Sequence, residues 1–212
     1  IIDISNPSNP TLTGNYYTPD YYAGGVTING NYAYVAGFLA GLQIIDISNP
    51  SNPTFAGSYN TSGYAVGVTI NGNYAYVADD QDGLQIINIS NPSNPTLIGS
   101  YNTPGFSQDV TVNGNYAYVA DEYMGLQIID ISNPSNPTLT GNYNTPGDAW
   151  GVTLNGNYAY VADWEFGLQI IDISNPYNPT LTGFYDTPGD ALDVTVNGNY
   201  AYVADDQDGL QI

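Results

Sequence analysis

Residues 113–120 read NGNYAYVA, and this octapeptide decides the fold because it returns at a fixed distance along the chain. Its five copies begin, 42 residues apart, at Asn29, Asn71, Asn113, Asn155 and Asn197. The tetrapeptide GLQI follows each copy, beginning at Gly41, Gly83, Gly125, Gly167 and Gly209. Self-similarity at a period of this length is the sequence signature of a repeat architecture, so one repeat is the unit to interpret.

Each repeat predicts four strands, which we call A to D in chain order. Strand A is short, as in GVTI at residues 67–70, and the Asn-Gly pair after it predicts a type I′ hairpin turn into strand B, NYAYVA at residues 73–78. Strand C is GLQIIDIS or a variant, with aliphatic residues on both faces, which is typical of a strand covered from both sides. NPSNP then ends strand C, because proline cannot donate a hydrogen bond to a sheet, and strand D follows, as in TLTGNY at residues 138–143.

Four short strands in every 42 residues, without helical periodicity, predict the blades of an all-β propeller. Five periods fill the chain, so we expect a single domain over residues 1–212 with five blades. Ile1 and Ile212 occupy the same position of the repeat, so the cut falls inside strand C. Both a ring closed through that strand and a window of a longer repeat protein fit this pattern.

The repeat also resembles a known family. GLQIIDISNPSNPTLTGNYNTPG at residues 125–147 and VTVNGNYAYVAD at residues 110–121 are similar to the LVIVD repeat of bacterial and archaeal surface proteins, and the resemblance extends over essentially the whole chain. It implies a propeller fold and a cell-surface location, but no shared activity. The chain departs from the family pattern in having no basic residue.

The composition excludes several classes of function. The chain has 20 acidic residues, no Lys, Arg or His, and a formal net charge of −20. Nucleic-acid binding and electrostatic docking on an anionic membrane both depend on basic side chains, and no apolar run is long enough to insert into a membrane. Without cysteine there is neither a disulfide framework nor thiol chemistry.

Sequence variation between the repeats is concentrated in two loops. In a propeller, the B–C and D–A loops emerge on one face, and the A–B and C–D loops emerge on the other. The A–B turn (Asn-Gly) and the C–D loop (NPSNP) hardly change, so their side is the constant face. The variable face is formed by residues 37–40, 79–82, 121–124, 163–166 and 205–208 of the B–C loops, and by residues 20–25, 63–67, 105–109, 147–151 and 189–193 of the D–A segments.

Aromatic and acidic residues gather in these variable segments, a combination that suits stacking on sugars and equally suits protein interfaces. The candidate binding residues are Tyr22, Phe38, Tyr64, Phe106, Tyr123, Trp150, Trp164 and Phe166, with Tyr21 beside them. The carboxylates are those of Asp79, Asp80, Asp82, Asp121, Glu122, Asp148, Asp163, Glu165, Asp190, Asp205, Asp206 and Asp208. Unconstrained loop drift is the alternative explanation.

Two loops read DDQDG and offer candidate calcium ligands, because calcium prefers several oxygen ligands in flexible geometry. The candidates are Asp79, Asp80, Asp82, Asp205, Asp206 and Asp208. A solvated polar loop explains the same residues without a metal, so we expect no cofactor and leave calcium open.

Other carboxylates suggest structure more than chemistry. The Asp of strand C becomes Asn88 in one repeat, which suits a hydrogen-bond acceptor and does not suit proton transfer. Asp109 and Asp193 begin strand A where other repeats have Gly, and a carboxylate pair at the channel mouth is the one feature that would suit a polysaccharide hydrolase. Without His, Lys, Arg or Cys, we expect no catalytic residues and no enzyme.

The sequence therefore favours a non-enzymatic propeller at the cell surface that serves as a structural or interaction module. Self-association into a surface assembly or filament, or binding to other surface proteins, would use these faces. The alternative is a lectin-like glycan-binding propeller that uses the variable face.

Overall fold

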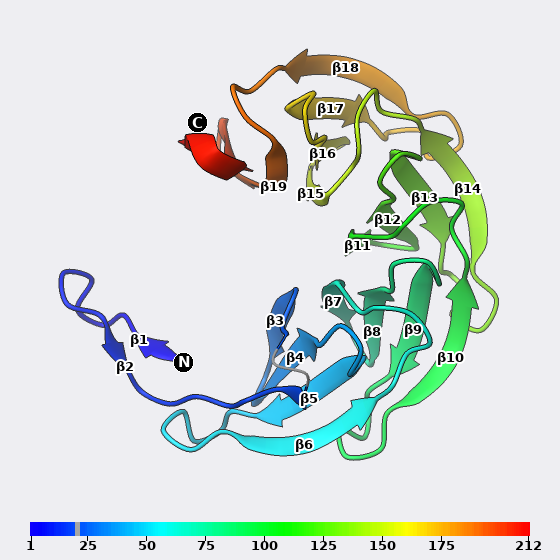
Figure 1. Ribbon diagram of the computed structural model, residues 1–212. Helices are drawn as coiled ribbons and strands as arrows, with labels where there is room; N and C mark the ends of the chain where they lie inside the picture. Colours follow the sequence, from blue (N-terminus) through cyan, green and yellow to red (C-terminus); the bar gives the residue numbers. More distant parts are fainter. Residues whose placement is uncertain (20–21) are drawn as a thin grey trace.

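The computed structural model describes residues 1–19 and 22–212, and Figure 1 shows them as small sheets fanned around a central opening. Strand A of successive repeats lies innermost: β3 (Val26–Asn29), β7 (Gly67–Asn71), β11 (Asp109–Asn113), β15 (Gly151–Asn155) and β19 (Ala191–Asn197). Strand B comes next: β4 (Tyr32–Ala36), β8 (Tyr74–Ala78), β12 (Tyr116–Ala120), β16 (Tyr158–Ala162) and β20 (Tyr200–Asp205).

The outer half of each sheet contains strands C and D. Strand C is β1 (Ile2–Asp3), β5 (Leu42–Asp46), β9 (Leu84–Asn88), β13 (Leu126–Asp130), β17 (Leu168–Asp172) and β21 (Gly209–Gln211). Strand D is β2 (Thr11–Leu12), β6 (Thr54–Tyr59), β10 (Thr96–Tyr101), β14 (Thr138–Tyr143) and β18 (Thr180–Tyr185). A 3-10 turn at Asp206–Asp208 joins β20 to β21.

The predicted all-β propeller of four-stranded blades is confirmed. Four antiparallel sheets are complete, in the orders β3-β4-β5-β6, β7-β8-β9-β10, β11-β12-β13-β14 and β15-β16-β17-β18. The strands of the fifth blade are divided between the two ends of the chain, as the sheet β19-β20-β21 and the pair β1-β2. Figure 1 shows these two ends on opposite sides of a gap in the ring.

The core lies between blades. Ile86 and Ile87 are neighbours in β9 and both are fully buried, but their side chains point to opposite faces of the sheet. Ile87 packs in a cluster with Leu42 and Ile44 of the preceding blade, whereas Ile86 packs with Ala117 and other residues of the following blade. Strand C is therefore apolar on both faces because each face is an interface between blades.

The A–B hairpins form as expected, but the predicted type I′ turn is wrong. Asn71 pairs with Tyr74, so Gly72 and Asn73 are the central residues of the turn. Gly72 has a φ of 59°, whereas Asn73 is not among the described residues with positive φ. Positive φ at the first central residue alone, with Gly there, is the type II′ arrangement, which also matches the twist of the strands.

The acceptor role predicted for the Asp of strand C is confirmed. In four repeats the aspartate Oδ1 accepts the N–H of the serine two residues later, at 2.8 Å. The four aspartates are Asp3, Asp46, Asp130 and Asp172. In the remaining repeat Asn88 Oδ1 accepts the N–H of Ser90 at 2.9 Å, so the asparagine amide makes the equivalent hydrogen bond. These hydrogen bonds lower the pKa of the four carboxyl groups below the usual value.

Candidate functional site

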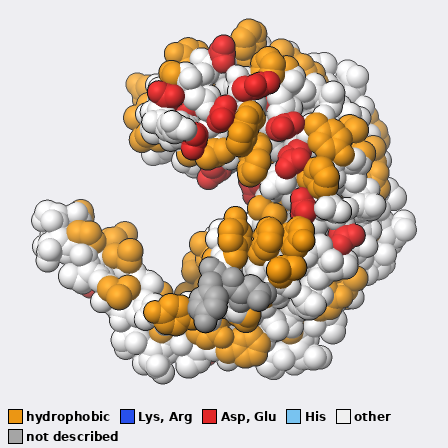
Figure 2. Space-filling view, viewed as in Figure 1, with side chains coloured by type: hydrophobic (Ala, Val, Ile, Leu, Met, Phe, Trp, Pro, Cys, Tyr) orange, Lys and Arg blue, Asp and Glu red, His pale blue; other side chains and the backbone are white. Residues whose placement is uncertain are grey.

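The two kinds of variable loop lie against each other at one end of the blades, as predicted. In four of the B–C loops one residue forms an antiparallel bridge with a residue of the D–A segment that leads to the next blade: Phe38 with Ala65, Asp80 with Ser107, Glu122 with Ala149, and Trp164 with Ala191. Each bridge has two N–H···O hydrogen bonds of 2.9–3.1 Å. Successive blades are thereby linked into one continuous surface, and Figure 2 shows hydrophobic and acidic side chains gathered around the central opening.

Seven of the eight predicted binding residues pack as pairs or a triplet of rings. Phe38 stacks on Tyr64 with centroids 4.3 Å apart and also contacts Tyr22 at 4.8 Å. The Trp150 and Trp164 centroids are 5.1 Å apart, and an edge-to-face contact of 5.7 Å joins Phe106 to Tyr123.

Phe166, the eighth predicted residue, belongs to none of these ring contacts. The Phe166 ring lies so close to Gly147 that a Cβ there would be 2.8 Å from the ring. Tyr21 lies outside the described residues.

The first residue of four B–C loops does not belong to the exposed surface, and the prediction that it would is wrong. Asp79, Asp121, Asp163 and Asp205 are buried, because each carboxylate turns inward to hold the D–A loop that precedes its own blade. Oδ2 accepts the N–H of a loop glycine at 2.9–3.1 Å, from Gly63, Gly105, Gly147 and Gly189. Asp121 and Asp205 also accept a threonine hydroxyl.

Loss of hydration raises the pKa of the buried carboxyl groups of Asp79, Asp121 and Asp163. The pKa of Asp79 and of Asp163 rises to about 6, and the pKa of Asp121 also rises. Hydrogen bonds from the loop amides of Gly63, Gly105 and Gly147 oppose this rise only in part. These groups anchor loops.

The calcium prediction remains a prediction. Asp79 and Asp205 already bind loop amides, which leaves Asp80 and Asp82 in one DDQD segment and Asp206 and Asp208 in the other. Within residues 1–19 and 22–212, no three acidic side chains lie close enough together to hold a metal ion.

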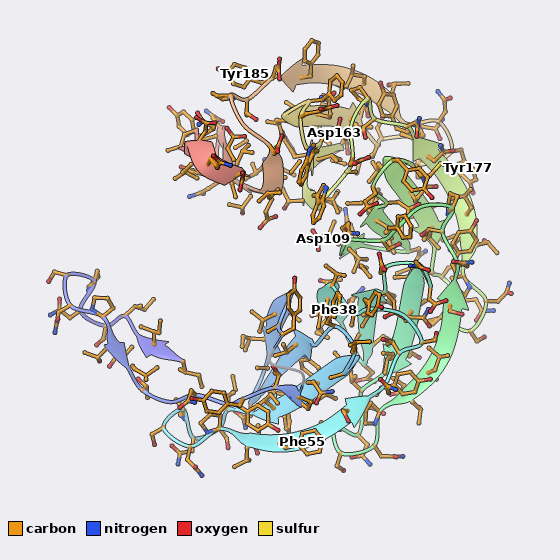
Figure 3. The ribbon with its side chains drawn as sticks, viewed as in Figure 1. Phe38, Phe55, Asp109, Asp163, Tyr177 and Tyr185 are labelled. Carbon is orange, nitrogen blue, oxygen red and sulfur yellow. The ribbon has the colours of Figure 1, made fainter. Side chains whose placement is uncertain are left out.

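A cavity of about 470 Å³ lies where the strands at position A begin, on the variable face. Asp109 and Asp193 both line it, so the prediction that they lie at the channel mouth is confirmed. Gly25, Gly67 and Gly151 occupy the equivalent positions of the other blades, and Trp150 and Gln108 add polar groups to the wall. Figure 3 shows Asp109 at the inner edge of the fan.

The two carboxylates of this cavity have different environments. Asp109 joins neighbouring blades: its Oδ2 accepts the N–H of Val152 in β15 at 3.0 Å, and its Oδ1 accepts the N–H of Val110 at 2.8 Å. Loss of hydration, opposed in part by these hydrogen bonds, raises the pKa of Asp109 to about 6, and nearby Asp193 adds repulsion. Asp193 is exposed, and among the described residues its carboxylate accepts the N–H of Val194 alone, through Oδ1, so Oδ2 is the oxygen open to a ligand.

Gln108 belongs to the site and was missed in the sequence. Its Nε2 donates to Glu122 Oε1 at 2.9 Å, which connects the channel mouth to a B–C loop. A comparison of the repeats could have identified it, because Gln108 is a polar residue at a position that is otherwise Gly24, Val66, Trp150 or Leu192.

The described residues include no helix that is long and apolar enough to cross a membrane. No curated protein sequence matches the chain. Among solved structures, the computationally designed Ika8 protein aligns with 89% of this chain at 7% identity and a TM-score of 0.72, and the alignment spans 57% of the Ika8 chain.

Two natural proteins give similar alignments. A functionally unknown protein from Desulfotomaculum acetoxidans aligns with 85% of this chain and 62% of its own, at 17% identity and a TM-score of 0.67. The β-propeller domain of Cps50 (Swd1) from Myceliophteria thermophila aligns with 88% of this chain and 68% of its own, at 13% identity and a TM-score of 0.68. At these identities the likeness concerns the fold alone.

The family comparison agrees with the repeat found in the sequence. The model of the LVIVD repeat matches residues 1–18, 21–61, 62–103, 104–145, 146–187 and 188–212. These segments cover all but two residues, with boundaries that follow the blades. The chain therefore belongs to the LVIVD-repeat family.

Proposed function

We propose that this propeller is a non-enzymatic interaction module at the cell surface, and that it engages its partners through the variable face. The observation that carries the proposal is the way neighbouring loops are bridged, since the bridges collect the variable segments of successive blades into one surface. The nearly identical blades form a rigid body that positions this surface, and the variable loops determine which partner it recognises.

The backbone of the variable loops adds support. Phe38, Glu122 and Trp164 adopt φ values of 55°, 42° and 49°, in the left-handed region that bulky side chains disfavour. Unconstrained drift at these positions would favour glycine or asparagine. Phe38 and Trp164, each held in this backbone geometry against a second ring, are better explained by a binding role.

A double variant, Trp150→Ala with Trp164→Ala, tests the proposal on a glycan array and on cell-surface proteins of the producing organism. The matched control is Tyr177→Ala, which removes an exposed ring from a C–D loop on the constant face. We expect the double variant to lose the binding that the native chain and the control show. Unchanged binding in the double variant, or no binding by the native chain, would contradict the proposal.

Glycan binding is the second candidate, and the tryptophan pair favours it. Trp150 and Trp164 lie 5.1 Å apart, and Trp150 also lines the cavity that contains Asp193. An indole face beside a free carboxylate can stack on a sugar ring while accepting hydroxyl hydrogen bonds. If the protein binds glycans, titration with a neutral oligosaccharide should quench its tryptophan emission. If it binds only proteins, the emission should not change.

Assembly into filaments or layers would use the constant face, whose NGN and NPSNP segments carry no charge. Such a face can stack on another copy without direct repulsion, despite the net charge of −20. Light scattering and electron microscopy of the full protein test this use, and a strictly monomeric protein would count against it.

A further inference from the structure

Departures from the repeat pattern converge on the outer part of one complete blade, β15–β18. Phe166 stands where the other B–C loops have Ala40, Asp82, Met124 and Asp208. Phe184 in β18 stands where the other repeats have Asn15, Ser58, Ser100 and Asn142. Both changes place a phenylalanine where no other repeat has an aromatic residue.

These two rings line the same groove. A cavity of about 670 Å³ lies between β18 and the loop that enters the blade from β14. Its lining includes Phe166, Phe184, Leu181 and Pro146 as apolar walls. The polar lining comes from Asn144, Gln169 and Asp186. The walls belong to two complete blades, so the groove does not depend on the divided fifth blade.

The packing of the blade does not account for Phe184. This side chain is 66% exposed, and Leu181 next to it in the groove is 41% exposed. Other repeats form the same strand D with a serine or asparagine at that position, so the ring is not needed for folding. An apolar concave surface of this size with a small polar rim is typical of a binding site.

The chemistry of the groove selects its occupant. Phe166, Phe184, Leu181 and Pro146 make the walls mainly apolar, and a sugar buried against them would leave hydroxyl groups without hydrogen-bond partners, so the groove suits an apolar side chain better than a glycan. Asp186 replaces an asparagine of three repeats (Asn60, Asn102 and Asn144) and brings a negative charge to the rim. The chain has no basic residue and a net charge of −20, so the complementary partner is basic.

We propose that this groove binds a peptide segment of a partner protein through one apolar side chain, with a neighbouring Lys or Arg paired to Asp186. The inference deepens the interaction role proposed above and rests on it, because Phe166 forms the outer edge of the variable face. It assigns that edge a partner of defined chemistry: apolar and basic residues adjacent in an extended segment.

Selection from a random twelve-residue peptide library tests the proposal, with the native chain as bait. We expect enriched peptides to combine an aromatic or aliphatic residue with an adjacent Lys or Arg. Synthetic copies are then titrated against two variants that restore residues of other repeats, Phe184→Ser and Asp186→Asn. Phe184→Ser should weaken binding about tenfold or more, and Asp186→Asn should weaken it less while removing most of its salt dependence.

The controls separate this proposal from the function of the whole face. Phe55→Leu removes another exposed phenylalanine by the same kind of restoration, and it should leave both binding and melting temperature unchanged. Phe184→Ser should also melt like the native chain. Peptide binding could be lost in the Trp150→Ala, Trp164→Ala variant but retained in Phe184→Ser. That result would contradict the groove as the peptide site, while the proposed function of the variable face would stand.

Two further results would overturn the proposal. One is a library selection that yields no peptide, or only peptides that bind Phe184→Ser as well as the native chain. The other is a glycan whose binding depends on Phe184 while no peptide binds, which would assign the groove to a sugar.

Discussion

A buried aspartate after the dipeptide Val-Ala turns a sequence-variable loop into a fixed one. Asp163 receives the N–H of Gly147 at 3.0 Å and so attaches the B–C loop to the loop that enters its blade. The first repeat has Gly37 instead, and there the N–H of Phe38 still pairs with Ala65. The bridge between blades therefore persists without the carboxylate, and the carboxylate adds a second attachment.

Asp163→Asn should reduce the pH dependence of stability. The folded-state pKa of about 6 lies above the ordinary 3.8, so between these values the folded protein keeps a proton that the unfolded chain has lost. Asp163 thus contributes stability at low pH, and that contribution is lost as the pH rises through about 6. The free energy of unfolding should fall by about 1 kcal/mol less between pH 5 and pH 7.5 in the variant than in the native chain.

Urea unfolding at the two pH values measures this difference. Glu165→Gln, which changes an exposed carboxylate of the same loop, is the control and should keep the native pH dependence. An Asp163→Asn protein with the native pH dependence would contradict the assignment.

At the residue scale, the sequence predicted the role of a side chain when its hydrogen-bond partner is close in the chain. It did not predict the role when that partner is far away in the chain. The acceptor role of Asp46 depends on a serine two residues away, so the pattern of one repeat contains it. The burial of Asp79 depends on the N–H of Gly63, 16 residues earlier, and its residue type alone suggested an exposed polar loop. The groove at Phe184 could have been found by comparing strand D between repeats, since its signal is a single aromatic residue at a polar position.

At the scale of elements, the A–B hairpins depend on glycine at the first turn position. Gly114 has a φ of 58°, and no atom lies within 4 Å of the position where a Cβ would be built. A side chain there would meet no neighbour, so the cost of adding one is that of the backbone conformation alone.

Gly114→Ala should therefore lower the free energy of unfolding by about 1–2 kcal/mol, the cost of placing an L-residue in the left-handed region. Gly183→Ala is the matched control, because Gly183 also has open space around it but is not among the glycines with positive φ. Denaturant midpoints compare the two, and an equal loss in both variants would contradict the turn assignment.

The strands themselves were predictable because burial and periodicity agree. The aliphatic pairs of strand C, such as Ile86 and Ile87, point to opposite faces and require a partner on each side. The turn type was not predictable from the Asn-Gly pair, because the register decides which residues are central. Asn71 pairs with Tyr74 and so belongs to the strand.

At the scale of the whole molecule, the main feature is a large negative charge that no basic side chain neutralises. A net charge of −20 without any basic side chain makes the compact state repel itself, and only counterions screen that repulsion. The melting temperature should rise by a few degrees as NaCl increases from about 10 mM to about 500 mM, because the Debye length falls from about 30 Å to a few ångströms.

Replacing exposed carboxylates tests the origin of that rise. A variant with Asp206→Asn and Asp208→Asn should melt higher at low salt and gain less from added NaCl. A melting temperature that is insensitive to salt in the native chain would contradict self-repulsion as a significant term.

The propeller architecture and the grouping of variable loops were predictable, since both follow from a 42-residue period and from alternating loop directions. The arrangement of the aromatic residues was not. The pairing of Phe38 with Tyr64 and of Trp150 with Trp164 depends on how loops approach one another in space, which the repeat pattern does not specify.

The most direct test places a nitroxide quencher on either face and measures tryptophan emission. Both tryptophans belong to the variable face and the chain has no cysteine, so Tyr123→Cys and Asn115→Cys give single labelling sites. Tyr123 follows Glu122, which is bridged to Ala149 beside Trp150, whereas Asn115 lies in an A–B turn on the constant face. We predict strong quenching from position 123 and little from position 115; equal quenching, or stronger quenching from position 115, would contradict a single variable face.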